Sequence, residues 1–260
     1  MKEQFSRQHY ENVIRKLEDV RKAGQGDQLD TQDIGMGLAS CAATADKPPY
    51  SYDKTKLVIA FWLFTRIENT AATSSTGHSS PIPSFFFEDI MKVCWATKER
   101  DKALNYLAKF NERNYQMTEP LLRHLILTLA DDPVDSTFAD DMEAYYKTYK
   151  TLKKDNNWTA ESDVYEAVAL SFAEFGEADN ALNVLRDLVE AGMHPSEKLC
   201  SKMLTKSLLV GNLEIVRVVG NWYLSNFDVR LEYGILCKML EMAASTGDHQ
   251  IGSIAFQVSK

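Results

Sequence analysis

Apolar residues recur along this chain at the spacing of an α-helix, and short segments rich in Gly and Pro separate one apolar stretch from the next. The first stripe joins Tyr10, Val13, Ile14, Leu17 and Val20 at intervals of three and four residues, which is typical of one face of an amphipathic helix. The same pattern continues almost to the C-terminus. It predicts helices at 10–20, from about 31, and at 54–68, 85–96, 101–107, 121–130, 138–149, 162–174 and 179–190. Four further helices are predicted around the apolar residues at 203–209, 215–219, 235–240 and 251–256.

The second predicted helix is rich in small residues. Gly35, Gly37, Ala39, Ala42 and Ala43 lie within it. Because small side chains let two backbones approach closely, we expect a neighbouring helix to pack tightly here.

A period of about one helical hairpin appears in the C-terminal half. Gly176 separates two predicted helices, and Gly211 and Gly247 stand at the same point of two later pairs, at spacings of 35 (211 − 176) and 36 (247 − 211) residues. Gly192 followed by Pro195 ends the second helix of the clearest pair, as Gly at a C-cap and Pro shortly beyond it commonly do. The chain therefore contains stacked helical hairpins.

The period extends backward in a weaker form. Residues 85–96 and 101–107 repeat the order of two helices around a turn, with Lys98 in place of the turn glycine and Asn114 where Gly192 stands. Residues 121–130 and 138–149 are expected to form the next pair. An extension at about 151–159 follows before the clearest unit begins.

The chain is predicted to have two parts. Residues 1–83 are expected to form N-terminal helical hairpins that include a flexible loop near 69–84, since that segment is rich in Thr, Ser, Ala and Gly and carries two prolines. Residues 84–260 carry the repeats.

The clearest unit resembles the pentatricopeptide repeat family. The resemblance is carried by Tyr165, Phe172, Gly176, Ala181-Leu182, Gly192 and Pro195. It is specific for this unit, weaker in its neighbours, and covers about 175 residues, 84–258. The alternatives are tetratricopeptide repeats, which have a 34-residue period and their glycine inside the first helix, and a stack of generic hairpins. The expected fold is all-α, a right-handed α-solenoid of about six to seven helix-turn-helix hairpins.

The resemblance implies a groove that holds single-stranded RNA, one base per repeat, and a role in organellar RNA metabolism, in a mitochondrion or plastid. It also implies which residues face the groove, near the start of each first helix or just after the inter-repeat Pro. These are Glu88, Arg123, Glu166, Ser201 and Cys237, with Thr118, Ser196 and Glu232 as second positions.

Charge favours a different occupant of that groove. Glu88, Glu166 and Glu232 would place carboxylates where phosphates should pass, and the 260-residue chain has a net charge of −8. We therefore expect a non-enzymatic adaptor or scaffold subunit of an organellar gene-expression or ribonucleoprotein assembly, which binds protein partners through its concave face. The alternative is a direct RNA binder that acts in RNA processing, stability or translation.

One segment combines acids and lysines. Asp140 and Asp141 open the helix predicted from residue 138, an arrangement that suits the helix dipole and is typical of a solvated surface helix. The alternative is a basic patch for a partner's RNA, formed by Lys147, Lys150, Lys153 and Lys154, together with Lys54 and Lys56.

The aromatic residues lie in apolar runs at helical spacing, which favours core packing over base stacking. Phe85, Phe86 and Phe87 are consecutive and point to different sides of a helical turn, so at least one ring is expected to face a neighbour or a partner.

Other chemistry finds little support in the sequence. It contains no phosphate-binding glycine loop, no nucleophile elbow and no zinc-binding spacing, so we expect no catalysis, cofactor, metal or small-molecule substrate. Cys41, Cys94, Cys200 and Cys237 are scattered, as buried thiols in a reducing compartment are.

No apolar run is long enough for a membrane span. The N-terminus shows no secretory signal or transit peptide, so in an organellar protein the numbered chain would begin after cleavage.

Overall fold

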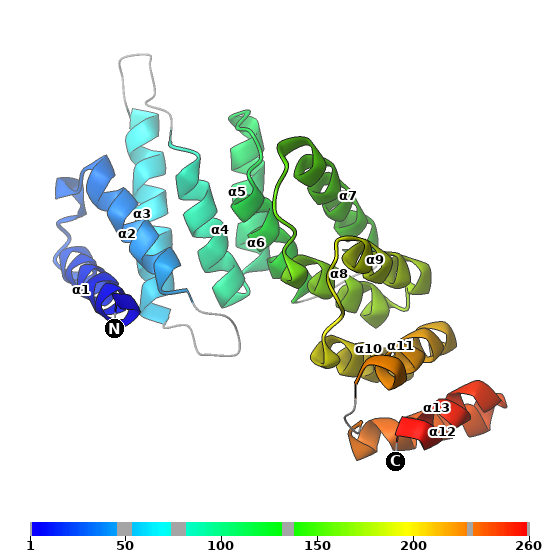
Figure 1. Ribbon diagram of the computed structural model, residues 1–260. Helices are drawn as coiled ribbons and strands as arrows, with labels where there is room; N and C mark the ends of the chain where they lie inside the picture. Colours follow the sequence, from blue (N-terminus) through cyan, green and yellow to red (C-terminus); the bar gives the residue numbers. More distant parts are fainter. Residues whose placement is uncertain (1, 46–53, 74–81, 132–137, 228–230, 259–260) are drawn as a thin grey trace. The chain divides into compact units, whose positions relative to one another are not determined.

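The computed structural model describes residues 2–45, 54–73, 82–131, 138–227 and 231–258, and over these residues the chain folds into thirteen α-helices and one short 3-10 helix, with no strand. The all-α fold expected from the sequence is confirmed. By its internal contacts the chain divides into two compact units, 1–128 and 129–260. Figure 1 labels the helices along the chain. The division of the sequence at residue 83 rested on where the repeat motif begins, and it stays a prediction.

The first unit contains the N-terminal helices. Its elements are α1 (Lys2–Lys22), η1 (Gly26–Gln28), α2 (Thr31–Ala43), α3 (Lys54–Thr73), α4 (Phe85–Thr97), α5 (Arg100–Glu112) and most of α6 (Glu119–Ala130). Helices α1, α2 and α3 pack against one another, and α4 packs against α2, α3 and α5. A capping box fixes the start of α2, because Asp30 and Asp33 each accept a hydrogen bond from the other's backbone N–H.

Close approach at α2 is confirmed. A Cβ atom on Gly37 would lie 2.6 Å from Leu63 Cδ1 and 2.7 Å from Leu17 Cδ1, and one on Gly35 would lie 2.9 Å from a ring carbon of Phe86. A side chain at either point would force these neighbours to move, so glycine allows the close packing.

The aromatic residues of this unit form its core, as the sequence predicts. Phe86 and Phe87 are buried, and Phe87 makes edge-to-face contacts with Phe64 and Phe110. Phe85 keeps about half of its surface exposed (52%). The three consecutive rings therefore do face different sides.

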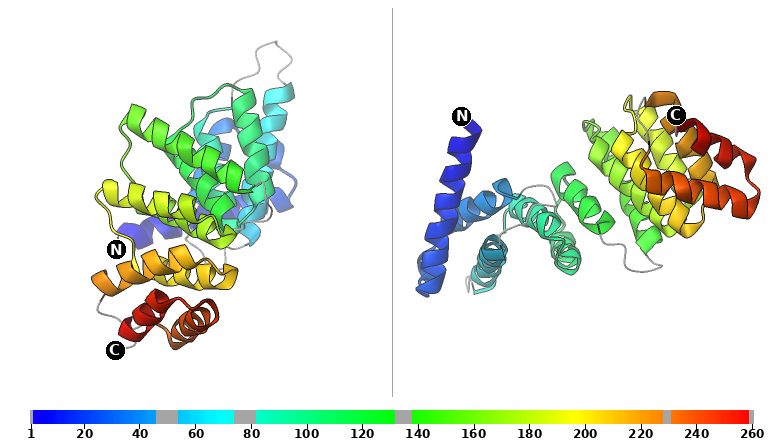
Figure 2. Two further views of the ribbon diagram at one scale, coloured as in Figure 1. Left: turned by 90° about the vertical axis from the view of Figure 1, so that its right-hand side faces the viewer. Right: turned by 90° about the horizontal axis from the view of Figure 1, so that it is seen from below.

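The second unit consists of helical hairpins that repeat. Its helices are α7 (Phe138–Asn156), α8 (Ser162–Phe175), α9 (Ala178–Glu190), α10 (Glu197–Val210), α11 (Leu213–Asn226), α12 (Tyr233–Thr246) and α13 (His249–Val258). The first helices of successive hairpins pack in the order α8, α10, α12, and the second helices in the order α9, α11, α13. Figure 2 shows the same hairpins from two further directions.

Each hairpin of this unit turns at a glycine in left-handed backbone. Gly176, Gly211 and Gly247 have φ of 77°, 75° and 72°, a conformation that costs other residues free energy. The turn positions inferred from the 35- and 36-residue spacing are confirmed. In the first unit Lys98 has φ 59° and Asn114 has φ 54°, so the two substitutes for glycine are confirmed as well.

Helices α3 and α7 continue into segments that the sequence predicted to lie outside them. The loop expected near 69–84 begins later, because α3 continues to Thr73, where Thr70 Oγ1 donates to the Arg66 carbonyl at 2.9 Å. Residues 74–81 of that predicted loop lie outside the described residues. At its far end Ile82 is buried, and its carbonyl accepts a hydrogen bond from the Tyr115 hydroxyl.

The extension expected at 151–159 is likewise helical up to Asn156, and Asn157, at φ 54°, ends α7. The pair predicted from 121–130 and 138–149 corresponds to α6 and α7. The boundary between the two units falls within this pair.

Candidate functional site

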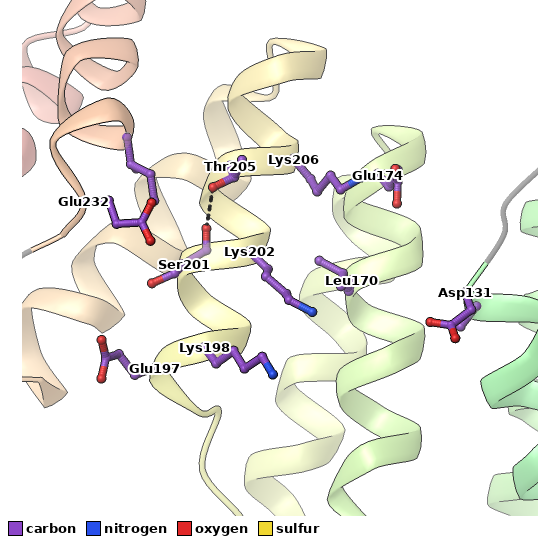
Figure 3. A pocket seen from close by; sticks show the side chains of 12 residues that line it. Asp131, Leu170, Glu174, Glu197, Lys198, Ser201, Lys202, Thr205, Lys206 and Glu232 are labelled. Atoms are coloured by element: carbon purple, nitrogen blue, oxygen red, sulfur yellow. Dashed lines mark hydrogen bonds and ion pairs between the residues drawn. The ribbon is translucent and has the colours of Figure 1, made fainter. Parts of the chain in front are cut away.

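A cleft of about 610 Å³ opens along the first helices of the second unit (Figure 3). Helix α8, helix α10 and the N-terminal end of α12 form its walls, and Ala130 and Asp131, at and just after the end of α6, also line it. The lining residues are Ala130, Asp131, Leu170, Glu174, Glu197, Lys198, Ser201, Lys202, Thr205, Lys206, Glu232 and Ile235.

Helix α10 places a row of lysines in this cleft. Lys198, Lys202 and Lys206 are four residues apart and all line it, because residues at that spacing share one helix face. The opposite face carries buried residues such as Met203 and Leu204, both with no exposed surface. Burial of the apolar face thus fixes the direction in which the lysines point.

Helix α8 faces this row with an acidic residue. The Lys206 ammonium donates to the Glu174 carboxylate, and both side chains stay about one-third exposed. An ion pair this accessible contributes no more than about 1 kcal/mol. Lys198 and Lys202 are exposed and have no hydrogen-bond or ion-pair partner among the residues that the structure describes.

Two other carboxylates of the cleft lie at helix starts. Glu197 opens α10 and accepts a hydrogen bond from the Tyr223 hydroxyl at 3.2 Å. Burial and the nearby Glu197 carboxylate raise the pKa of Tyr223, so the phenol stays protonated and can donate. Glu232 precedes α12, is exposed, and its side chain does not cap the helix.

This arrangement suits recognition of a charged, extended surface. Carboxylate and ammonium groups lie on the same wall, with two hydroxyls between them on α10, Ser201 and Thr205, and with Leu170 and Ile235 as apolar neighbours. Within the described part of the chain, no three His, Cys, Asp or Glu side chains are grouped so as to hold a metal ion.

Only some of the predicted groove residues of the second unit line the cleft. Ser201 and Glu232 line the cleft. Glu166 is half-buried on α8, one turn before Leu170, and Cys237 is half-buried on α12. Ser196 caps α10, since its hydroxyl accepts from Leu199 N at 3.1 Å; this bond uses one lone pair of the hydroxyl.

In the first unit two of the predicted residues come together. Thr118 Oγ1 donates to Glu88 Oε1 at 2.8 Å, and both side chains are half-buried. Glu88 therefore has a partner within the chain. Arg123 is half-buried in α6 and is also engaged in an interaction.

The lysines of the candidate basic patch on α7 are mostly paired. Lys147 contacts Glu143 at 2.5 Å, Lys150 contacts Asp187 at 2.8 Å, and Lys153 donates to the Tyr165 hydroxyl at 2.8 Å, while Lys154 is exposed. A hollow of about 410 Å³ lies beside them, next to Trp158. In the first unit Lys56 contacts Glu11 at 3.8 Å. The side chain of Lys54 lies outside the described residues.

None of the four cysteines, all of which lie in the described part of the chain, forms a disulfide. Cys41, Cys94 and Cys200 are buried and Cys237 is half-buried, so the expectation of buried packing residues is confirmed for the first three. Burial raises the pKa of Cys41 to about 12, which keeps the thiol protonated and unreactive at neutral pH.

The lysine row of α10 was not recognised from the sequence. Its signal is the spacing of Lys198, Lys202 and Lys206, which by itself is equally typical of a solvated helix face. Only the packing of α8 and α12 on either side turns that face into the wall of a cleft.

The fold and the cleft define a class: an all-helical protein with repeat-like helical hairpins and a charged cleft on their first helices. Comparisons with protein-family models, with curated proteins and with solved structures gave no match. Over the described residues, every helix is too short or too polar to cross a membrane.

Proposed function

We propose that this chain is a non-enzymatic helical-repeat adaptor or scaffold, which binds protein partners through the concave face formed by the first helices of its hairpins. In this proposal the hairpins continue as a right-handed α-solenoid of about six to seven units. The regular packing of α8 on α10 and of α10 on α12 supports it. The resemblance to pentatricopeptide repeats suggests an organellar gene-expression or ribonucleoprotein assembly as the setting.

The observation that carries the proposal is the mixed charge of the cleft. Asp131, Glu174, Glu197 and Glu232 line it together with three lysines. A protein partner can match both signs side by side, and such complementarity gives specificity. A polyphosphate backbone can match only the lysines and is repelled by the carboxylates.

A direct RNA-binding role is the second candidate, and the lysine row of α10 favours it. Lys198 and Lys202 are exposed on successive turns, with Ser201 and Thr205 beside them. Ammonium groups on such a row can follow a phosphate backbone. The net charge of −8 and the carboxylates of the same cleft weaken this candidate.

A crosslinked pulldown from cells that express the protein, scored for both protein and RNA, tests the two functions. The test variant is Glu166→Gln/Glu232→Gln. The control is Glu177→Gln/Glu190→Gln. It removes the same charge from two exposed residues at the two ends of α9, outside the cleft. An adaptor should lose specific protein partners in the test variant and keep them in the control, because only the first pair lies on the first-helix face.

Two results would count against the adaptor. One is a strong RNA crosslink that increases in the test variant, as expected when carboxylates repel phosphate. The other is a set of protein partners that is the same in wild type, test variant and control.

A further inference from the structure

The charged groups of the cleft are unequally engaged. Glu174 and Glu197 each have a partner inside the chain, the first Lys206 and the second Tyr223. Lys198 and Lys202 have none within the described part of the chain and extend from α10 into the cleft (Figure 3). Lys198 and Lys202 therefore offer two unpaired ammonium groups to a partner, although the cleft also carries carboxylates and the chain as a whole is negative.

The two lysines define a spacing. They lie on successive turns of α10, so their attachment points are about 6 Å apart along the helix axis. Carboxylates at positions i and i+4 of a partner helix have the same separation. Between and beside the lysines lie the half-buried Ser201 and Thr205 and the apolar side chains of Leu170 and Ile235, which suit a surface that is acidic but not uniformly charged.

We propose that the cleft binds an acidic helical segment of a partner protein, whose carboxylates at i and i+4 pair with Lys198 and Lys202. The proposal rests on the adaptor function and names the chemistry of its partner. Glu232 at the rim is exposed, and a basic or polar residue at the end of the same segment can lie beside it. A nucleic acid backbone has no positive charge that could pair with Glu232, so it would leave this carboxylate without a partner.

Two synthetic peptides and an RNA serve as probes. One peptide is a short helix former with Glu at i and i+4 among Ala and Leu, the second has Gln at both positions, and the RNA is a single-stranded oligouridine. The test variant is Lys198→Gln/Lys202→Gln. The control is Arg15→Gln/Lys16→Gln, which also removes two positive charges from exposed side chains and so gives the same net charge, −8 − 2 = −10.

Binding is measured by fluorescence anisotropy at low and at high salt. We expect the Glu peptide to bind the wild type and the control equally, and to bind the test variant about tenfold more weakly, since two exposed ion pairs are lost. Raising the salt should weaken the complex of the wild type with the Glu peptide. The Gln peptide should bind every protein weakly, with an affinity no higher than that of the test variant for the Glu peptide.

Other outcomes overturn the inference. Equal binding of the Glu and Gln peptides, or equal loss in test and control variants, would show that the two lysines do not select carboxylates. Tight binding of oligouridine that depends on Lys198 and Lys202 would assign the cleft to nucleic acid and remove the adaptor function with it. If the pulldown keeps cleft-dependent protein partners while the Glu peptide fails to bind, the adaptor function stands and only the acidic partner is wrong.

Discussion

At the scale of single residues, backbone conformation decides what each hairpin turn accepts. Gly176, Gly211 and Gly247 lie in the left-handed region, and so do Lys98 and Asn114 in the first unit. A side chain in that region costs about 1–2 kcal/mol through contact of Cβ with the backbone. The first unit tolerates this cost at two turns, whereas the hairpins of the second unit avoid it with glycine.

A pair of glycine substitutions isolates this effect. A Cβ atom would meet nothing within 4 Å at either Gly211 or Gly234, but only Gly211 has a positive φ, of 75°. We expect Gly211→Ala to lower the free energy of unfolding by about 1–2 kcal/mol. Gly234→Ala, inside α12, should raise it by about 0.5–1 kcal/mol. Urea denaturation measures both, and a loss of similar size in both variants would contradict the explanation.

Asp89 on α4 makes stability depend on pH. Burial, and then repulsion from Glu88, raise the pKa of its carboxyl to about 6, against the opposing attraction of Lys92. The folded state therefore keeps this proton at a pH where the unfolded state has lost it, so the contribution of Asp89 to stability falls as the pH rises from about 4 to about 6.

Asp89→Asn should remove that dependence. We expect the variant to be more stable than the wild type by about 1–3 kcal/mol near pH 7, and to differ little from it near pH 4. Asp101→Asn, at an exposed position in the first turn of α5, is the control. Chemical denaturation at the two pH values measures the difference, and an equal gain at both would rule out the titration of Asp89 as its cause.

At the scale of helices and hairpins, equivalent positions differ by whether another hairpin covers them. Ala169, Leu204 and Leu240 each lie seven residues before a turn glycine. The first two have no exposed surface, because α8 packs on α10 and α10 packs on α12, whereas Leu240 is 51% exposed. A leucine at the same position of the repeat is therefore expected to contribute more to stability in α10 than in α12.

Truncation of the two leucines should reveal this difference. We expect Leu204→Ala to lower the free energy of unfolding by about 2–4 kcal/mol, because it leaves a cavity between packed helices. Leu240→Ala should cost less than about 1 kcal/mol, because much of that side chain already contacts water. Thermal and urea denaturation supply the comparison. Equal losses would mean that Leu240 is covered in solution.

The sequence predicted the helices better than it predicted the site. Periodic apolar positions and turn glycines located nearly all helices, and even Lys98 and Asn114 were placed correctly, because local rules govern turns. The predicted end of α7 was wrong, since polar residues such as Lys153 and Asn156 continue a helix as readily as they form a loop. The lysines of α10 could not be assigned to a cleft, because that depends on which neighbours flank the helix.

At the scale of the whole molecule, the chain forms two compact units, 1–128 and 129–260. In the first, α1, α2 and α3 meet closely around Gly37. In the second, successive hairpins supply each other's partners. Each unit therefore has its own set of packing contacts. We expect a destabilising substitution in one unit to increase local unfolding mainly within that unit.

Gly37→Ala tests this expectation. The new Cβ atom forces Leu17 and Leu63 to move, so we expect a loss of about 1–3 kcal/mol in the first unit. Hydrogen exchange measured by mass spectrometry should show faster exchange in peptides from 1–128 and unchanged exchange in peptides from 129–260. Gly252→Ala, where the nearest atom would lie at an ordinary 3.6 Å, is the control. Faster exchange along the entire chain would contradict independent units.

The interactions that link neighbouring hairpins of the second unit span short stretches of chain. Asn212 donates to the Gly176 carbonyl, Lys206 pairs with Glu174, and Arg217 pairs with Asp248, over separations of 36, 32 and 31 residues. Closing such loops costs little chain entropy, and proteins with mainly local contacts fold quickly. The second unit can therefore begin to fold at any hairpin and add the neighbouring ones in turn, so its folding can follow the order in which the hairpins leave the ribosome.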